Sequence, residues 1–329
     1  MRKTRAFYGA LQGNYWTLAP QVARSLSPPT TPPGVPFRHT FEGAVGEITL
    51  SGELHVPDDA LRHEDLPLII VVHGLGGSIE SGYTKDAAWA AIGAGAACLR
   101  INLRGASRNG DDIYHAGLRE DLDQLLRAKA LARFQRIHIL GYSLGGHLTL
   151  CFAADPSDRR VQSFGAICPP LLLAPGIAHI DRKRYAPYRR HVLKGLKEIF
   201  AAYATRGRPL PCAPSLAAGA KTLREWDTRV VAPHFGFDSA EHYWESQSAG
   251  RTLRDITRPT LIVTAEFDPM VPYPSAAQLL NAQSGDDSAV TCVVLRQGGH
   301  VGFPRVQPLQ VQSDGESVEA QMVHWLLGA

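Results

Sequence analysis

The chain has 329 residues, of which 44% are hydrophobic and 20% are charged, a balance typical of a globular protein with a large buried core. The formal net charge of +3 lacks the strongly basic character of most nucleic-acid-binding proteins, so we expect no nucleic-acid partner. The 5 cysteines lie far apart and form no CxxC or Cys/His spacing, which favours a reducing compartment.

The first part of the chain, residues 1–45, is expected to form an N-terminal arm. Residues 1–26 hold no uninterrupted apolar run like that of a signal peptide, and no run approaches the ~18 apolar residues of a membrane span. The stretch "SLSPPTTPPGVPF" (25–37) is rich in Pro and Ser and is predicted to be extended and irregular. We therefore expect a soluble, cytoplasmic protein whose arm wraps over the body.

The body of the chain has the pattern of a mostly parallel β-sheet. Residues 46–56 alternate apolar and polar side chains, as an edge hairpin would. Helical periods at 118–126 and 318–326 indicate an α/β fold with helices on both faces of the sheet. The buried strands are expected in short apolar runs: "PLIIVVHG" (67–74), "GAACLRINLRG" (95–105), "RIHILGYS" (136–143), "VQSFGAICPP" (161–170) and "PTLIVTAEFD" (259–268).

This alternation is interrupted between residues 171 and 258. We interpret the interval as a helical cap inserted into a core formed by 46–170 and 259–329, because apolar residues recur there at helical spacing: Val192, Leu196, Ile199, Phe200 and Tyr203. Within it, 181–198 holds seven Lys or Arg residues against two acidic ones, a net charge of +5. Such a run is usually a solvated helix face, and the alternative is weak peripheral contact with an anionic membrane.

Ser143 lies in the pattern Gly141-Tyr142-Ser143-Leu144-Gly145, directly after a predicted strand and directly before the helical run "HLTLCFAA". A strand, G-x-S-x-G and a helix in this order are the context of a nucleophile elbow. Any Cβ at the two glycine positions is expected to clash with neighbouring backbone. The alternative is a plain tight turn, but the context favours Ser143 as a nucleophile.

A serine nucleophile needs a histidine base and a carboxylate that orients the histidine. On this architecture the order along the chain is Ser, then Asp or Glu, then His. Asp268 lies just past a buried strand, and His300 lies in the glycine-rich turn after the next one. The sequence therefore predicts the triad Ser143, Asp268 and His300.

Other residues compete for two of these roles. Glu266 is two residues before Asp268, but it is closer to the strand end and is interpreted as structural. Asp286 and Asp287 precede the last strand, at the opposite end of the sheet, and are interpreted as part of a solvated turn. His324 falls within a predicted helix. For His300, the alternative to a catalytic base is a histidine that caps a helix or packs in the core.

A tetrahedral intermediate needs two N–H donors for its oxyanion. In a fold with a nucleophile elbow, one donor comes from a loop after an earlier strand, and "HGLGGS" (73–78) lies in such a loop. We therefore assign one donor to the backbone N–H of Leu75 and the other to that of Leu144, the residue after Ser143. His73 is interpreted as a structural residue of this loop. HExxH, P-loop and dinucleotide-binding motifs are missing from the sequence, so we expect no metal and no cofactor.

Over about residues 45–328 the chain resembles the α/β-hydrolase superfamily, and several stretches are similar to its YheT-like branch of esterases and lipases. This resemblance implies Ser143, Asp268 and His300 as the triad and activity on carboxylic esters. Two of the similar stretches lie in the cap. The stretches are "HGLGGS", "INLRGASRN" followed by "YHAGLREDL", "YRRHVLKGLKE", "LREWDTRVVAPHFGFDSAEHYWESQS", "DPMVP" and "GGHVGF".

The functional hypothesis is hydrolysis of a small-molecule ester, with a short- to medium-chain acyl group or a lipid-like structure, through an acyl-enzyme. An alcohol O-acyltransferase would use the same three residues, and a non-catalytic binding protein of the same fold is the alternative from another class. The sequence does not indicate whether the protein is a monomer or an oligomer.

Overall fold

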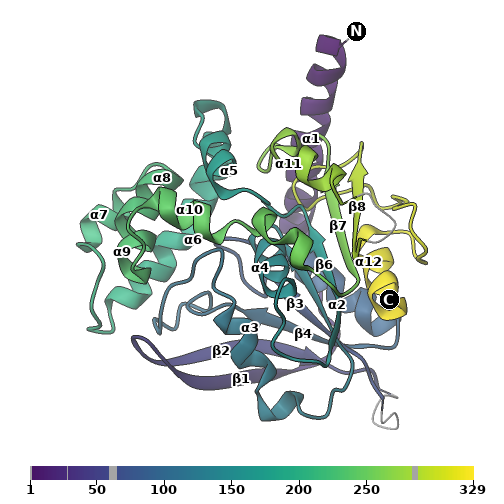
Figure 1. Cartoon of the computed structure of the whole chain (residues 1–329), viewed down its shortest axis with the longest axis horizontal. Helices are drawn as coiled ribbons and strands as arrows, with labels where there is room; N and C mark the ends of the chain where they lie inside the picture. Colours follow the sequence, from purple (N-terminus) through teal and green to yellow (C-terminus); the bar gives the residue numbers. More distant parts are fainter. Residues whose placement is uncertain (1, 28, 59–64, 284–287) are drawn as a thin grey trace.

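An eight-stranded sheet forms the centre of the structure, a computed structural model that describes residues 2–27, 29–58, 65–283 and 288–329 (Figure 1). The strand order is β1-β2-β4-β3-β5-β6-β7-β8. β2 pairs antiparallel with β1 and β4, and all other neighbours are parallel, which confirms the predicted α/β class. The strands are β1 (Gly34–Gly43), β2 (Gly46–His55), β3 (Leu68–Val72), β4 (Ala97–Asn102), β5 (Ile137–Tyr142), β6 (Val161–Ile167), β7 (Thr260–Ala265) and β8 (Val290–Leu295).

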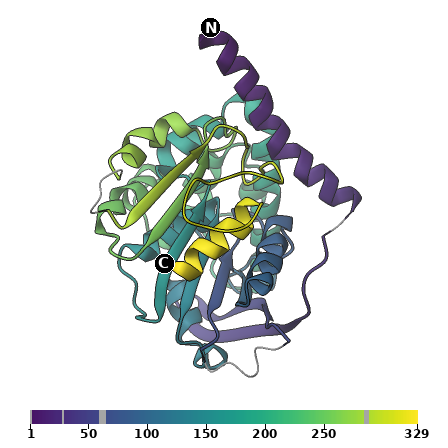
Figure 2. The ribbon, with the colours of Figure 1, turned by 90° about the vertical axis from the view of Figure 1, so that its right-hand side faces the viewer.

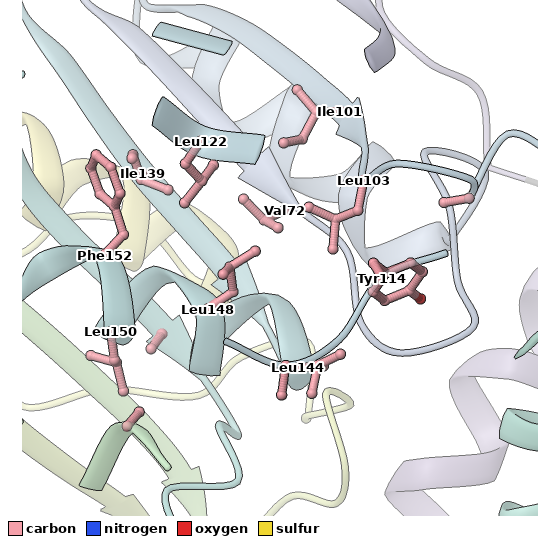
Figure 3. Close-up of a cluster of buried hydrophobic side chains, with 14 of the residues drawn as sticks. Val72, Ile101, Leu103, Tyr114, Leu122, Ile139, Leu144, Leu148, Leu150 and Phe152 are labelled. Carbon is pink, nitrogen blue, oxygen red and sulfur yellow. The ribbon is translucent and has the colours of Figure 1, made fainter. Parts of the chain in front are cut away.

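Helices cover both faces of this sheet because alternate strand residues point to opposite sides. Ile69 and Val71 of β3 pack with α2 (Gly82–Gly93) and α12 (Val318–Gly328) on one face. Their neighbours on β3 face α3 (Glu120–Leu126) and α4 (Leu144–Ala153) on the other face. Figure 3 shows this second core, where strand residues point toward helix residues: Val72, Ile101 and Ile139 face Leu122 and Leu148.

The chain between β6 and β7 forms a group of helices beside the sheet (Figure 1). The five apolar residues predicted at helical spacing are all buried along α6. These helices fall within the interval 171–258, and its treatment as a separate cap stays a prediction. They are α5 (Leu173–Ile180), α6 (Ala186–Ala204), α7 (Pro214–Ala218), α8 (Leu223–Trp226), α9 (Ala232–Phe235) and α10 (Ala240–Gln247); α11 (Tyr273–Asn281) follows β7.

The N-terminal segment differs from the predicted extended arm. Residues Arg2–Leu26 form the helix α1, which runs along one side of the body and projects beyond it with its first turns (Figure 2). The predicted irregular stretch 25–37 is wrong at both ends, because its start belongs to α1 and its last four residues belong to β1. Phe37 is buried against the core, and Pro36 is tolerated because β1 is the outermost strand, where a missing N–H breaks no ladder. All of β2 pairs with β1, and its residues 51–55 also pair with β4, so the edge strand of the hairpin is β1 rather than β2.

Candidate active site

The turn between β5 and α4 holds Ser143 in a strained conformation. Its φ of 51° and ψ of −117° lie where non-glycine residues are rare, as expected for a nucleophile elbow. A Cβ at Gly141 would lie 2.2 Å from the carbonyl oxygen of Gly145, and one at Gly145 would lie 2.4 Å from the carbonyl oxygen of Val72. The close approach that the sequence predicted at both glycines is therefore present.

The structure brings the three predicted triad side chains into one chain of hydrogen bonds. His300 Nε2 lies 2.8 Å from Ser143 Oγ, and His300 Nδ1 lies 2.8 Å from Asp268 Oδ2. Asp268 Oδ1 accepts hydrogen bonds from the N–H groups of Met270 and Val271, at 2.7 and 2.9 Å. Because an ionised carboxylate can only accept, Nδ1–H donates to Asp268, which leaves Nε2 as the acceptor for the Ser143 hydroxyl.

The competing residues lie elsewhere. The Glu266 carboxylate accepts from the guanidinium of Arg5 at 2.9 Å, and the Asp268 carboxylate is the one that bonds to His300. His324 is on α12, half exposed, and its nearest acidic partner is 3.8 Å away. Asp286 and Asp287 lie outside the described residues.

The two loops that would bind an oxyanion meet beside Ser143. Leu75 and Leu144 both line the cavity that contains the Ser143 side chain. In the described part of the chain the backbone N–H groups of Leu75 and Leu144 have no protein acceptor, whereas those of Gly74 and Gly76 donate to tyrosine hydroxyl groups. Two backbone donors next to the predicted nucleophile are therefore left for a ligand.

His73 supports the first of these loops. Its Nδ1–H donates to the carbonyl oxygen of Gly74 at 2.8 Å, and its Nε2 accepts from the N–H of Leu103 at 3.2 Å. Burial lowers the pKa of His73 to about 4, so the ring is neutral at neutral pH. Both ring nitrogens are used within the protein, which agrees with the structural role expected from the sequence.

A cavity of about 360 Å³ opens at Ser143 and His300. A narrow inner space of about 40 Å³ shares Leu144, Ile177 and Leu223 with it and is closed by Trp226, Tyr243 and Trp244. An apolar cavity of this shape suits a hydrocarbon chain better than a polar group. Its apolar lining comes mainly from the elbow and the inserted helices: Leu144, Leu173, Ile177, Ile180, Val192 and Leu223.

Sequence reasoning missed the part of the site that α1 supplies. Thr17 Oγ1 accepts a hydrogen bond from the backbone N–H of His300 at 2.8 Å and donates to the carbonyl oxygen of Gly13 at 2.7 Å. A Cβ at Gly299 would lie 2.3 Å from that same Gly13 oxygen, so α1 packs directly on the loop of His300. The regular spacing of apolar residues in 7–26 is the signal that could have predicted this helix.

Cys168, Asp268 and His300 have potential metal-ligand atoms within 4.8 Å of one another. Burial raises the pKa of the Cys168 thiol well above its ordinary value, which disfavours the thiolate that a metal would need. Both His300 nitrogens already take part in hydrogen bonds to Ser143 and Asp268. Asp268 and His300 thus fit the hydrogen-bonded triad with Ser143 better than a metal site with Cys168, and the absence of metal and cofactor stays a prediction.

Comparison with known proteins agrees with this fold. Residues 67–304, more than half of the chain, match the family described as alpha/beta hydrolase fold, and the chain belongs to that family. The resemblance inferred from the sequence is thereby confirmed.

A protein of Escherichia coli (strain K12) named "Putative esterase YheT" is 29% identical over 243 residues, which cover 72% of this chain and 70% of that protein. The "Medium-chain fatty acid ethyl ester synthase/esterase 2" of Saccharomyces cerevisiae is 24% identical to this chain. The match covers 65% of this chain and 53% of the yeast protein. The solved structure of Est1E from Butyrivibrio proteoclasticus has a TM-score of 0.51 at 18% identity, over 80% of this chain and 90% of that one, and supports the fold alone.

Proposed function

We propose that this protein is a serine hydrolase that cleaves carboxylic esters with short- to medium-chain acyl groups or a lipid-like structure. The observation that carries the proposal is the hydrogen-bonded chain from Asp268 through His300 to Ser143 at the mouth of an apolar cavity. The similar proteins of Escherichia coli and Saccharomyces cerevisiae, whose names include esterase activity, support the same reaction class.

In the first step, the Ser143 hydroxyl gives its proton to His300 Nε2 while Oγ forms a bond to the ester carbonyl carbon. The carbonyl oxygen becomes an oxyanion and accepts hydrogen bonds from the backbone N–H groups of Leu75 and Leu144. The bond to the alcohol oxygen then breaks, and this oxygen takes the proton from His300. The products are a free alcohol and an acyl group on Ser143.

In the second step, water gives a proton to His300 and attacks the acyl carbon, and the acid leaves as Ser143 Oγ takes the proton back. Asp268 stays ionised throughout, fixes the tautomer of His300 and stabilises its imidazolium form. Its own orientation is held by the two backbone donors at 270 and 271.

Acyl transfer to an alcohol is a second candidate, and the apolar lining of the cavity favours it. In a water-poor cavity, an alcohol that binds apolar surface competes with water for the acyl-enzyme. The same triad serves both reactions. The two differ in which hydroxyl compound attacks in the second step.

The proposed function is tested with p-nitrophenyl esters from acetate to palmitate. We expect Ser143→Ala to lose at least about 10³-fold in kcat/KM, because the nucleophile is removed. Ser215→Ala, at an exposed position of α7, is the control and keeps wild-type activity. Formation of ethyl esters in the presence of ethanol, detected by mass spectrometry, would assign acyl transfer. A folded wild-type protein that is inactive across the whole series would instead favour a binding protein.

The partner that this function implies is a small-molecule ester. The basic segment 181–198 is proposed to add weak peripheral contact with anionic lipid, since its net charge of +5 lies beside the helices that line the cavity.

A further inference from the structure

α1 has two faces of different character. Gly9, Gly13 and Thr17 lie against the loops that carry Asp268 and His300. The opposite face exposes seven large apolar side chains, which fall within an arc of about 100° at 3.6 residues per turn. These residues are called the α1 stripe: Phe7, Tyr8, Leu11, Tyr15, Leu18, Val22 and Leu26.

The α1 stripe concentrates exposed apolar surface in one place. Its residues are between 45% and 83% exposed, and only five other large apolar residues in the described part of the chain are at least 36% exposed. One of these five, Trp89, lies in a groove with Pro20 and Arg24 near the C-terminal end of α1, and it lengthens the apolar surface. Contiguous exposed apolar surface of this kind marks a docking site rather than ordinary scatter.

The α1 stripe also lies beside the entrance of the cavity. Thr17, Pro20 and Arg24 of the same helix line the cavity together with His300. Whatever binds the outer face of α1 is therefore separated from the cavity by the width of one helix, about 10 Å.

Positive charge flanks this apolar surface. The described part of α1 contains no acidic residue, and the exposed Arg-Lys-Arg sequence at 182–184 follows α5. In Figures 1 and 2 the tip of α5 and the first turns of α1 rise at the same end of the molecule. The Tyr188 hydroxyl donates to Asn14 Oδ1, which ties the basic segment to α1. The surface is therefore complementary to negatively charged head groups above an apolar layer.

We propose that the α1 stripe docks the protein on an anionic lipid surface. Its tyrosines, with one apolar face and one polar tip, suit the boundary between head groups and acyl chains. A second copy is a poorer occupant, because a symmetric pair through α1 would bring two segments of +5 charge close together. Docking itself does not depend on catalysis. Its consequence, that the cavity comes close to esters in the lipid phase, rests on the proposed function.

The test is sedimentation of the full chain with vesicles of phosphatidylcholine containing phosphatidylglycerol, and with vesicles of phosphatidylcholine alone. We expect binding to the anionic vesicles, and a loss of about ten-fold or more in the triple variant Phe7→Ser, Leu11→Ser, Leu18→Ser. The matched control is Leu210→Ser, Leu216→Ser, Val306→Ser, which removes exposed apolar residues elsewhere and binds like wild type. None of these six residues lines the cavity, and thermal melts by circular dichroism serve as the folding control, which does not depend on catalysis.

Four results would overturn the proposal. One is a wild type that does not sediment, and another is equal loss of binding in both triple variants. The third is a wild type that elutes as a dimer while the α1 variant elutes as a monomer, since a second copy then covers the α1 stripe. The fourth is equal binding to both vesicle types, which contradicts an anionic surface as the occupant. Because binding is measured without turnover, an inactive protein that sediments contradicts the proposed function alone.

Discussion

Thr17 Oγ1 accepts a hydrogen bond from the backbone N–H of His300 at 2.8 Å, across 283 positions of sequence. Thr17 is only 2% exposed, and its own hydroxyl proton goes to the carbonyl oxygen of Gly13. The hydroxyl thus sits between the backbone of α1 and the turn that carries the predicted base. Through this contact the N-terminal helix becomes a structural part of the candidate active site.

Replacing Thr17 by Val removes the acceptor and leaves the His300 N–H buried without a partner. A loss of about 1–2 kcal/mol in the positioning of His300 corresponds to a fall in kcat of roughly 5- to 30-fold. Thr17→Ser keeps the hydroxyl and is expected to restore kcat to within about two-fold of wild type. Steady-state kinetics on p-nitrophenyl butyrate, with thermal melts as the folding control, separate the two variants. Equal kcat in the Val and Ser variants would show that Thr17 does not position His300.

Gly13 tests how closely α1 must pack on the Asp268 loop. A Cβ there would lie 1.9 Å from the carbonyl oxygen of Phe267, whereas a Cβ at Gly93 in α2 meets nothing within 4 Å. We expect Gly13→Ala to destabilise the protein by about 1–3 kcal/mol, despite the ~1 kcal/mol that alanine gains in helix propensity. Gly93→Ala should be neutral or stabilising. Urea unfolding curves measure both, and similar midpoints for the two variants would contradict tight packing of α1.

The carboxylate that orients His300 can be assigned by two matched amide variants. Asp268→Asn is expected to lower kcat about 10³- to 10⁴-fold, because the amide no longer fixes the tautomer of His300. Glu266→Gln breaks only the ion pair with Arg5, which is largely exposed and worth about 0–1 kcal/mol of stability. Its kcat should stay near the wild-type value. A large loss in Glu266→Gln, with little in Asp268→Asn, would reverse the assignment.

Ile177 is placed to limit acyl-chain length, since it lines both the main cavity and its inner extension. Ile177→Trp fills part of that space, so we expect the preferred p-nitrophenyl ester to become shorter while acetate hydrolysis changes little. Leu216→Trp on α7, which is exposed, is the control. Rates across the ester series provide the measurement. An unchanged chain-length profile would mean that the acyl chain lies elsewhere.

Asp227 gives the protein a pH-dependent stability. Burial raises the pKa of its carboxyl to about 7, although the indole N–H of Trp244 donates to it at 2.7 Å. The folded state therefore keeps a proton that the unfolded state releases near pH 4, and this contribution to stability falls as pH rises from about 4 to about 7.

In Asp227→Asn the neutral amide does not titrate, so its stability relative to wild type should rise by about 2–4 kcal/mol across that window. Urea midpoints at several pH values measure the difference. Ser215→Ala, which removes no titratable group from an exposed position, should show no such trend. Parallel curves for wild type and Asp227→Asn would contradict a buried neutral carboxyl.

Much of the fold and the triad could be predicted because the signals are local. β3, β5 and β7 are buried on both faces and read as continuous apolar runs, and the elbow glycines mark the turn that holds Ser143. Chain order then pointed to Asp268 and His300, and the structure brings both to Ser143.

The role of α1 could not be predicted because it depends on a contact between distant parts of the chain. The apolar residues of 7–26 recur at helical spacing, although Gly9, Gly13 and Pro20 are poor helix formers, so the sequence could indicate the helix but not where it docks. Its apolar residues point away from the body, where no pattern links them to the core. Likewise, β1 was not predicted because it contains Pro36. Proline is acceptable there only because β1 lies at the edge of the sheet, which the sequence does not reveal.

The separation of Thr17 from His300 has a consequence for synthesis of the chain. At about 5–20 residues per second, α1 leaves the ribosome roughly 15–60 s before the loop that it supports. During that interval neither face of the helix has its final partner, since the Asp268 and His300 loops that cover one face come from the last part of the chain. The candidate triad is therefore complete only after the loop of His300, which follows β8, has been translated, and until then neither face of α1 is covered on the nascent chain.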